Sequence, residues 1–316
     1  MSENQIDPHL AAWQEYEPYG WRSLLLGNGF SINIWERFAY TSLFNVATSG
    51  DVDPVLDATM FEKLGTSNFE DVLRALYHAR IVDEQLNSPQ RNEIEAIYSR
   101  TKNSLAAAVN FAHVPHGIAA LISINNAFRS FCRIYTTNYD LLPYWAIMHT
   151  DVWRFKDLFW GENNTFDPKD TSVSVDKCAI YYLHGAIHLV ELPDGKTKKL
   201  VGNGLTTLAD LFDLEHPEYF PLFISEGTSE GKLSRIKRND YLRFAFEKFQ
   251  TEEGNLVVLG HSLHKNYDQH LTDALSRSGL VSIAVGVWPH QPEEQILVFK
   301  SRLLAELAGK NVYFFD

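Results

Sequence analysis

The sequence predicts an α/β protein built on a Rossmann-like, doubly wound and mostly parallel sheet. Apolar strand runs alternate with helical patterns, which is typical of a parallel sheet covered on both faces. The chain also opens with a strand, a glycine turn and a helix, the first unit of nucleotide-binding α/β folds. Its 316 residues, 45% hydrophobic, are enough for a large core, and without repeats or linkers we expect one domain over residues 1–316.

The opening unit comprises an apolar strand at 23–26, the turn "GNGFS" from Gly27 to Ser31, and a helical pattern from near Ser31. From about residue 53 to 126 the pattern becomes helical, and one stretch repeats its apolar residues at helical spacing. This stripe consists of Phe69, Val72, Leu73 and Leu76. We therefore expect a helical layer inserted after the first βα unit.

Strand patterns recur after this layer, and all of them are expected to extend the parallel sheet. They are "FCRIYTTN" ending near Thr137, "CAIYYLHG" ending at His184, "PLFIS" near residue 223, "NLVVLGHS" ending near Gly260, "VSIAVGV" near residue 284 and the terminal "NVYFF". The segment "AIHLVELPDGKTKKLV" instead predicts a hairpin over about 187–201. Its Lys196, Lys198 and Lys199 are expected to form a solvated edge.

Charge and cysteine content disfavour several classes of function. A net charge of −12, from 40 acidic and 28 basic residues, argues against direct nucleic-acid binding. Two cysteines, Cys132 and Cys178, cannot build a disulfide scaffold or a cysteine-rich zinc module. The N-terminus has no signal-peptide pattern, and no apolar run approaches about 18 residues. We expect a cytoplasmic protein that does not enter the membrane.

Two of the polar segments at strand ends have both a ligand-binding and a local structural interpretation. Ligands of open parallel sheets bind beyond the carboxyl ends of the strands. In "GNGFS", the glycines let a phosphate approach the backbone and the helix start offers N–H groups, but the fingerprint G-x-G-x-x-G is incomplete and an ordinary tight turn is the alternative. In "TTNYD", Asn138 and Asp140 can point into the crevice, or Thr137 or Asn138 can cap the next helix.

Two further segments end strands. "LHG" carries His184 and Gly185, where a lone histidine is alternatively a core or loop residue. "LGHSLHKNYDQHL" carries Ser262, which can bond a ribose hydroxyl. This second segment also holds four metal-binding side chains, namely His261, His264, Asp268 and His270. We expect no metal, because bringing His264 and Asp268 together requires a helix that starts before the strand-end turn is complete.

The succession "GNGFS", "TTNYD", "LHG" and "LGHSL" resembles the sirtuin signature over roughly residues 23 to 290. In sirtuins a glycine loop holds the pyrophosphate of NAD and a T-x-N-x-D segment reaches the nicotinamide ribose. An HG dipeptide supplies the catalytic histidine, and a G-x-S loop meets the adenosine ribose.

The chain departs from the deacylating sirtuins at two points. Two cysteines cannot form their four-cysteine zinc module, and "INIWERFAY" replaces the proline–aspartate–phenylalanine–arginine run after their glycine motif. The chain is more similar to the sirtuin-like domains of bacterial anti-phage systems, which cleave NAD and carry a long helical insert after the first loop. The segment "PLFISEGTSEGKLSRIKRNDYLRFAFEKF" also resembles that branch.

The resemblance implies an NAD glycohydrolase that releases nicotinamide and ADP-ribose, with NAD as substrate and no zinc. His184 would be the general base, and Asn138 would orient the water and the ribose. Asp140 would orient Asn138, stabilise positive charge on the sugar or cap the next helix. The remaining dinucleotide contacts would come from Gly27, Asn28, Gly29, Phe30, Ser31, Thr137, Gly260, Ser262 and Leu263.

Other functions stay open at this point. One is an NAD- or ADP-ribose-binding subunit without turnover; another, disfavoured by the missing zinc module, is an NAD-dependent protein deacylase. A dehydrogenase is disfavoured by the incomplete glycine fingerprint. An unrestrained NAD glycohydrolase would exhaust its own cell, so we expect a homo-oligomer activated by a separate partner such as a HerA-like ATPase. NAD depletion would then serve abortive infection.

Overall fold

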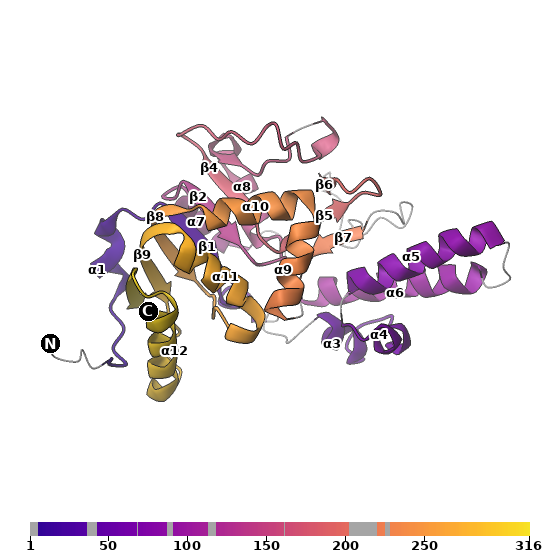
Figure 1. The fold of residues 1–316 in the computed structure, drawn as a ribbon, viewed down its shortest axis with the longest axis horizontal. Helices are drawn as coiled ribbons and strands as arrows, with labels where there is room; N and C mark the ends of the chain where they lie inside the picture. The colour runs from indigo at the N-terminus through magenta and orange to yellow at the C-terminus, as the bar shows by residue number, and fades with distance from the viewer. Residues whose placement is uncertain are drawn as a thin grey trace.

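The computed structural model confirms the predicted α/β class and the parallel central sheet (Figure 1). It describes residues 6–36, 43–67, 69–86, 91–112, 118–160, 162–201, 220–224 and 228–316. Seven strands pair in parallel throughout the main sheet. These strands are β1 (Ser23–Leu26), β2 (Arg133–Thr136), β3 (Phe155–Lys156), β4 (Cys178–Tyr182), β8 (Glu253–Leu259), β9 (Gly279–Gly286) and β10 (Asn311–Phe315).

Strand β1 lies at the centre of this sheet, in the order β10-β9-β8-β1-β2-β4-β3. The chain winds from β1 through β2 toward one edge, then returns to β8 and winds toward the other edge. Leu26 at the end of β1 aligns with Thr136 of β2 and with Leu259 of β8. The loops after β1, β2 and β8 therefore leave the sheet side by side at the point where the winding reverses, which is where doubly wound sheets bind ligands.

Helices cover the sheet in two groups that follow from the winding. Helices α7 (Ala120–Phe128) and α8 (Leu142–His149) pack against each other, whereas α10 (Asp240–Gln250) packs with α9 (Ser229–Arg238) and α11 (Lys265–Arg277). Helix α12 (Glu293–Glu306) contacts α11 and β10. Two short helices, α1 (Trp13–Tyr16) and α2 (Asn28–Ile32), flank β1 in sequence. None of the described helices is long and apolar enough to cross a bilayer.

The helical insert forms a layer with its own hydrophobic cluster. It comprises α3 (Leu43–Thr48), α4 (Thr59–Leu64), α5 (Phe69–Leu86) and α6 (Arg91–Ala112). The predicted stripe of α5 is buried in this cluster, and α5 and α6 project from the body as a paired arm (Figure 1). Helix α7, which the predicted range 53–126 included, packs instead into the core of the main sheet through Leu121, Ile124 and Phe128. Residues 113–117, before α7, lie outside the described ranges.

A small antiparallel sheet in the order β6-β5-β7 corrects two expectations. Strands β5 (Gly185–Glu191) and β6 (Thr197–Lys199) form the predicted hairpin. The "PLFIS" strand, β7 (Phe220–Phe223), pairs antiparallel with β5 and not with the main sheet, because the chain turns away from that sheet after His184. Lys199 is also buried, with its Nζ 2.6 Å from Asp157 Oδ2, so it is not part of a solvated edge.

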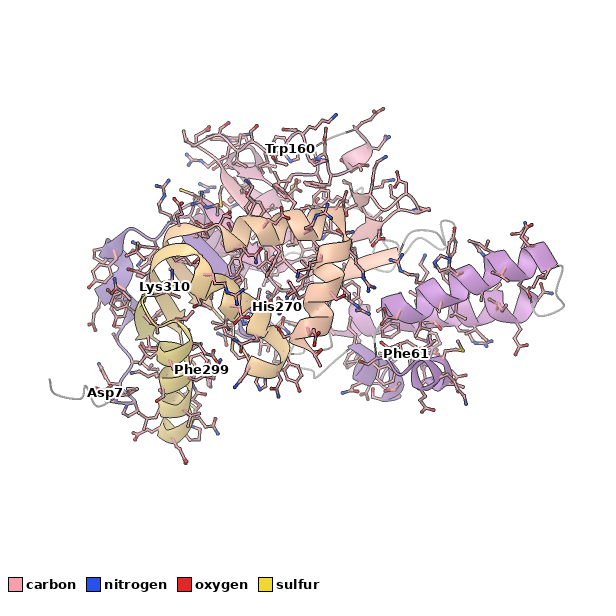
Figure 2. All side chains as sticks on the ribbon, viewed as in Figure 1. Asp7, Phe61, Trp160, His270, Phe299 and Lys310 are labelled. Carbon is pink, nitrogen blue, oxygen red and sulfur yellow. The ribbon has the colours of Figure 1, made fainter. Side chains whose placement is uncertain are left out.

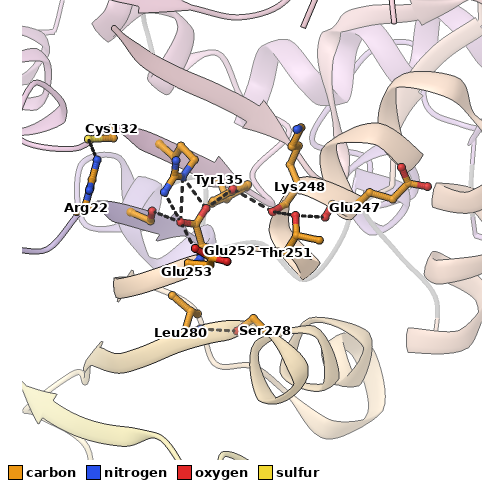
Figure 3. Close-up of polar contacts among 12 residues, drawn as sticks. Arg22, Cys132, Tyr135, Glu247, Lys248, Thr251, Glu252, Glu253, Ser278 and Leu280 are labelled. Atoms are coloured by element: carbon orange, nitrogen blue, oxygen red, sulfur yellow. Dashed lines mark hydrogen bonds and ion pairs between the residues drawn. The ribbon is translucent and has the colours of Figure 1, made fainter. Parts of the chain in front are cut away.

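One buried carboxylate ties three central strands together near their amino ends (Figure 3). Glu252, just before β8, accepts hydrogen bonds from Arg133 at 2.7–2.9 Å and from Ser23 Oγ at 2.9 Å. It also accepts a 2.5 Å hydrogen bond from the Tyr135 hydroxyl. Burial is tolerated because these donors replace the water that the charge loses.

We predict that Glu252→Gln lowers the free energy of unfolding by about 2 kcal/mol, because the neutral amide weakens charge-assisted hydrogen bonds to β1 and β2. Glu253→Gln is the matched control, since Glu253 is the next residue and is exposed; its effect should stay within about 0.5 kcal/mol. Urea titrations of both variants measure the difference. Equal losses would show that the carboxylate of Glu252 does not hold the strands.

Candidate functional site

A cavity of about 320 Å³ lies at the carboxyl ends of β1, β2, β4 and β8. Six of the residues predicted for the site line it: Asn28, Gly29, Thr137, His184, Gly260 and Ser262. Five further residues complete the lining: Tyr139, Ile224, Lys232, His261 and Asp268. Segments more than a hundred residues apart in sequence therefore meet around one polar cavity whose volume is in the range of small-molecule sites.

The loop after β1 and the loop after β8 touch backbone to backbone. The Gly27 N–H donates to the Leu259 carbonyl at 2.9 Å, and the Gly29 N–H donates to the Gly260 carbonyl at 2.8 Å. Gly260 has a φ of +64°, and a Cβ there would lie 2.1 Å from the Phe30 nitrogen. Glycine is therefore required at these positions for the contact between the two loops. Together the loops form one wall of the cavity, which we call the glycine wall.

Behind that wall, three predicted residues form a buried hydrogen-bonded row. Asn138 Nδ2 donates to Ser31 Oγ at 2.8 Å, and Ser31 Oγ donates to Asp140 Oδ2 at 2.8 Å. Asp140 Oδ1 accepts from the Leu142 N–H at 2.7 Å, at the start of α8. Asp140 therefore both orients Asn138, through Ser31, and binds the first N–H of α8. Asn138 Oδ1 is buried and has no hydrogen-bond partner among the described residues.

Burial dominates the electrostatics of this row. It raises the pKa of Asp140 from 3.8 to about 6, although hydrogen bonds from Ser31 and Leu142 oppose the shift. The carboxylate is therefore ionised at neutral pH but held there at a cost in folding free energy. Buried carboxylates with a raised pKa occur often at functional sites, where they are kept although they lower the stability of the fold.

His184 stands where the chain leaves β4 and turns into the small sheet. Gly185 has a φ of +75°, and a Cβ there would lie 2.1 Å from the Leu222 carbonyl oxygen, so only glycine lets β7 pass this close. The His184 carbonyl accepts from the Ile224 N–H at 2.7 Å. The imidazole is 2% exposed, with Nε2 3.0 Å from Nε2 of His270. Burial and the nearby Lys232 lower the pKa of His184 well below 6.5, so the ring is neutral at physiological pH.

An ion pair and another histidine complete the polar lining. Lys232 of α9 donates to Asp268 Oδ1 of α11 at 3.0 Å, and both side chains are largely buried. Burial by itself would raise the pKa of Asp268. The charges of His261 and Lys232 lower it by more, so the pKa lies below the ordinary 3.8 and the carboxylate stays ionised. Burial also lowers the pKa of His261. At neutral pH the lining therefore carries one balanced ion pair and neutral imidazoles.

Six predicted site residues do not line the cavity. Asn138, Ser31 and Asp140 form the buried row, and Gly27 provides the loop contact described above. Phe30 packs on Phe128 with ring centroids 6.3 Å apart. Leu263 is buried, and its carbonyl accepts from Arg302 at 2.7 Å.

Of the lining residues that the sequence did not assign, His261 and Asp268 stand inside a segment already noted for its histidines. Tyr139 lies inside "TTNYD", so proximity to that motif was its only signal. Lys232 and Ile224 belong to the long segment around α9, where no spacing marks them as site residues.

The four side chains weighed as a metal site take different positions. His264 accepts from the Asn266 N–H at the start of α11 and stacks on Tyr267, whereas His270 contacts His184. Within the described ranges, no three acidic, histidine or cysteine side chains lie together in a way that could hold a metal ion. Figure 2 marks His270 on α11, the helix that packs against α9.

The fold and the cavity define a doubly wound α/β protein with a polar cavity at its switch point, the place where such folds bind ligands. Residues 24–316 match the family described as "Domain of unknown function (DUF4917)", which covers most of the chain. The chain therefore belongs to the DUF4917 family. No curated protein matches the chain.

The glycine contact predicts a graded effect of two alanine substitutions around β8. Gly254 and Gly260 both have positive φ, but a Cβ at Gly254 meets nothing within 4 Å. Gly254→Ala should therefore cost only about 1–2 kcal/mol of unfolding free energy from backbone strain. Gly260→Ala should cost a further ~2 kcal/mol through the clash with Phe30. Chemical denaturation measures both, and equal costs would refute the packing argument.

Burial of Asp140 predicts a pH dependence with a definite sign. Because the folded pKa of about 6 lies above the ordinary 3.8, the folded state binds this proton more tightly, and the contribution to stability falls as pH rises from about 4 to 6. The difference in unfolding free energy, wild type minus Asp140→Asn, should therefore fall by about 3 kcal/mol across that interval. Denaturation at a series of pH values checks this, and a difference that rises or stays flat would contradict it.

Proposed function

We propose that this chain is an NAD glycohydrolase that cleaves NAD to nicotinamide and ADP-ribose. One observation carries the proposal: the four segments that resemble the sirtuin signature, dispersed over the chain, each contribute residues to one cavity at the switch point. The parallel sheet brings the carboxyl ends of β1, β2, β4 and β8 together, and the four motifs occupy those ends. Doubly wound folds also bind dinucleotides at the switch point.

The dinucleotide is placed across the glycine wall. Asn28 and Gly29 on one loop and Gly260 and Ser262 on the other flank the pyrophosphate and the adenosine ribose. The nicotinamide ribose then lies toward Thr137 and His184, which line the β2 and β4 side of the cavity. Asn138 Oδ1 is a buried acceptor with no described partner. A small shift of the neighbouring cavity wall would let a ribose hydroxyl donate a hydrogen bond to it.

Cleavage needs positioning more than acid catalysis. Nicotinamide is already cationic in NAD, so the bond from C1′ breaks with its electron pair passing to the ring nitrogen, and water adds to C1′. The protein must hold the ribose, limit water and fix one nucleophile. His184 acts beside that ribose, either by accepting a proton or by fixing a hydroxyl oxygen, and the neutral ring suits both roles.

The charge of the lining also suits the substrate. Lys232 supplies a cation near the phosphates, while Asp268 keeps the cavity from becoming strongly positive. A strongly positive lining would oppose the oxocarbenium-like state that forms as nicotinamide leaves. The paired charges therefore allow phosphate binding without penalising positive charge on the sugar.

A second candidate function is binding of NAD or ADP-ribose without turnover. It is favoured by the position of Asn138 and Asp140, whose side chains are fully buried behind the cavity wall. In that case the row is a structural support for the loops. The two functions share the same ligand and differ in whether the nicotinamide bond breaks.

The biological setting proposed for the activity is a cytoplasmic, bacterial anti-phage response that depletes NAD. Because free activity would be toxic, we propose a homo-oligomer that is activated by a separate partner, for which a HerA-like ATPase is the candidate. These elements rest on the resemblance alone, and neither nucleic acid nor a membrane is part of the proposed setting.

The test is release of nicotinamide from NAD, followed by chromatography with the purified chain, alone and with the partner encoded beside it. We predict release by the wild type and a loss of at least about 100-fold in His184→Ala. His290→Ala is the matched control, because His290 is exposed and lies outside the cavity lining, and it should retain full activity.

Asn138→Ala should lose activity to a similar degree if the buried row holds the ribose. Binding of NAD by wild type with no release in either condition would favour the non-catalytic candidate. Absence of both binding and release would refute the proposed function.

A further inference from the structure

His184 is the first of three side chains hydrogen-bonded in series. Its Nε2 lies 3.0 Å from Nε2 of His270, and the two rings meet end to end, with centroids 5.2 Å apart and planes inclined by 29°. His270 Nδ1 lies 2.9 Å from Ser229 Oγ, at the first turn of α9. Neither His270 nor Ser229 was predicted to lie beside His184. Because Nε2 of His184 faces His270, Nδ1 is the nitrogen left to meet a cavity ligand.

Counting hydrogens along this series assigns the protons. Ser229 Oγ accepts the His270 backbone N–H at 2.8 Å, and His270 Nδ1 is the one described acceptor within reach of its hydroxyl hydrogen. A neutral His270 with an accepting Nδ1 carries its proton on Nε2, which donates to Nε2 of His184. His184, also neutral, then carries its proton on Nδ1. Each direction of the series leaves one hydrogen without a described acceptor: this arrangement leaves His184 Nδ1–H, which a ligand in the cavity can accept, and the reverse leaves the serine hydroxyl hydrogen.

We infer that His270 and Ser229 fix His184 as a neutral hydrogen-bond donor that presents Nδ1–H to the cavity. His184 then orients a hydroxyl oxygen of the substrate and does not abstract a proton. His270 is a positioning residue, because it reaches the substrate only through His184.

The charged groups around the pair maintain this state. Burial and Lys232 of α9 disfavour an additional proton on both imidazoles. Asp268 of α11, which accepts from Lys232, and Asp273 favour one on His270 but do not outweigh burial. His261 contributes a third, neutral ring from the β8 loop. Phe246 of α10 packs on His270 with centroids 5.9 Å apart and excludes water from its ring. Both rings are therefore neutral at neutral pH, and the hydrogen bonds from Ser229 to His270 and from His270 to His184 set the tautomer.

The catalytic part of this inference rests on the proposed function. Hydrolysis of the nicotinamide bond needs no protein base. As the C1′–nicotinamide bond breaks, its electron pair neutralises the departing ring. Water oxygen bonds to C1′, and the proton that it loses passes to solvent water. His184 keeps its proton throughout, and its Nδ1–H holds the ribose hydroxyl or the attacking water in place.

The first test compares two substitutions of His184 in the full chain. His184→Asn places an amide N–H near the position of Nδ1 but provides no base, whereas His184→Ala provides neither. We predict that His184→Asn retains nicotinamide release at least tenfold above His184→Ala, in line with the value of one oriented donor. Equal loss in two folded variants would overturn the donor role.

The second test reads the protons directly and needs no turnover. Two-bond ¹⁵N–¹H correlation spectra of histidine-labelled protein distinguish the tautomers, with His184→Asn and His270→Gln used to assign the signals. We predict Nδ1–H on His184 and Nε2–H on His270, with the His270 tautomer changed in Ser229→Ala. A proton on Nε2 of wild-type His184 would overturn the inference. Predicted tautomers in a protein that does not release nicotinamide would refute the proposed function alone.

Discussion

The site depends on one close contact, the backbone packing of Gly27 and Gly29 against Gly260. Strands β1 and β8 are neighbours in the sheet but are separated by more than two hundred residues in sequence. In a doubly wound sheet the loops after such strands diverge, which opens the crevice. Here the three glycines have no side chain, so the two loops touch. The cavity lies beside this contact, toward β2 and β4.

The polar residues around this contact form two layers with different physical roles. The inner layer, Ser31, Asn138 and Asp140, is fully buried and fixes the segments after β1 and β2 to each other through hydrogen bonds. The outer layer, with His184, Lys232 and Asp268, lines the cavity. An ionised Asp140 is held at a cost in stability, which the Glu252 cluster at the opposite end of the strands helps to offset.

Sequence patterns predicted the parallel sheet and half of the cavity lining, because strand periodicity and strand-end motifs are local signals. The assignment of "PLFIS" to the main sheet was wrong because an apolar run does not specify its pairing partner. Lys232 was missed for a related reason: its approach to Asp268 depends on how α9 packs on α11. Ser31 was predicted to contact the dinucleotide, but its hydroxyl donates to Asp140, a partner that the fold of the loop after β2 supplies.

The most direct test of the account is a crystal structure of His184→Ala with NAD, because a variant slow in cleavage retains the substrate. We predict a pyrophosphate against Asn28, Gly29 and the 260–262 loop, with C1′ of the nicotinamide ribose beside residue 184. NAD bound elsewhere, or bound with the nicotinamide ribose remote from residue 184, would contradict the central claim that this cavity cleaves the nicotinamide bond.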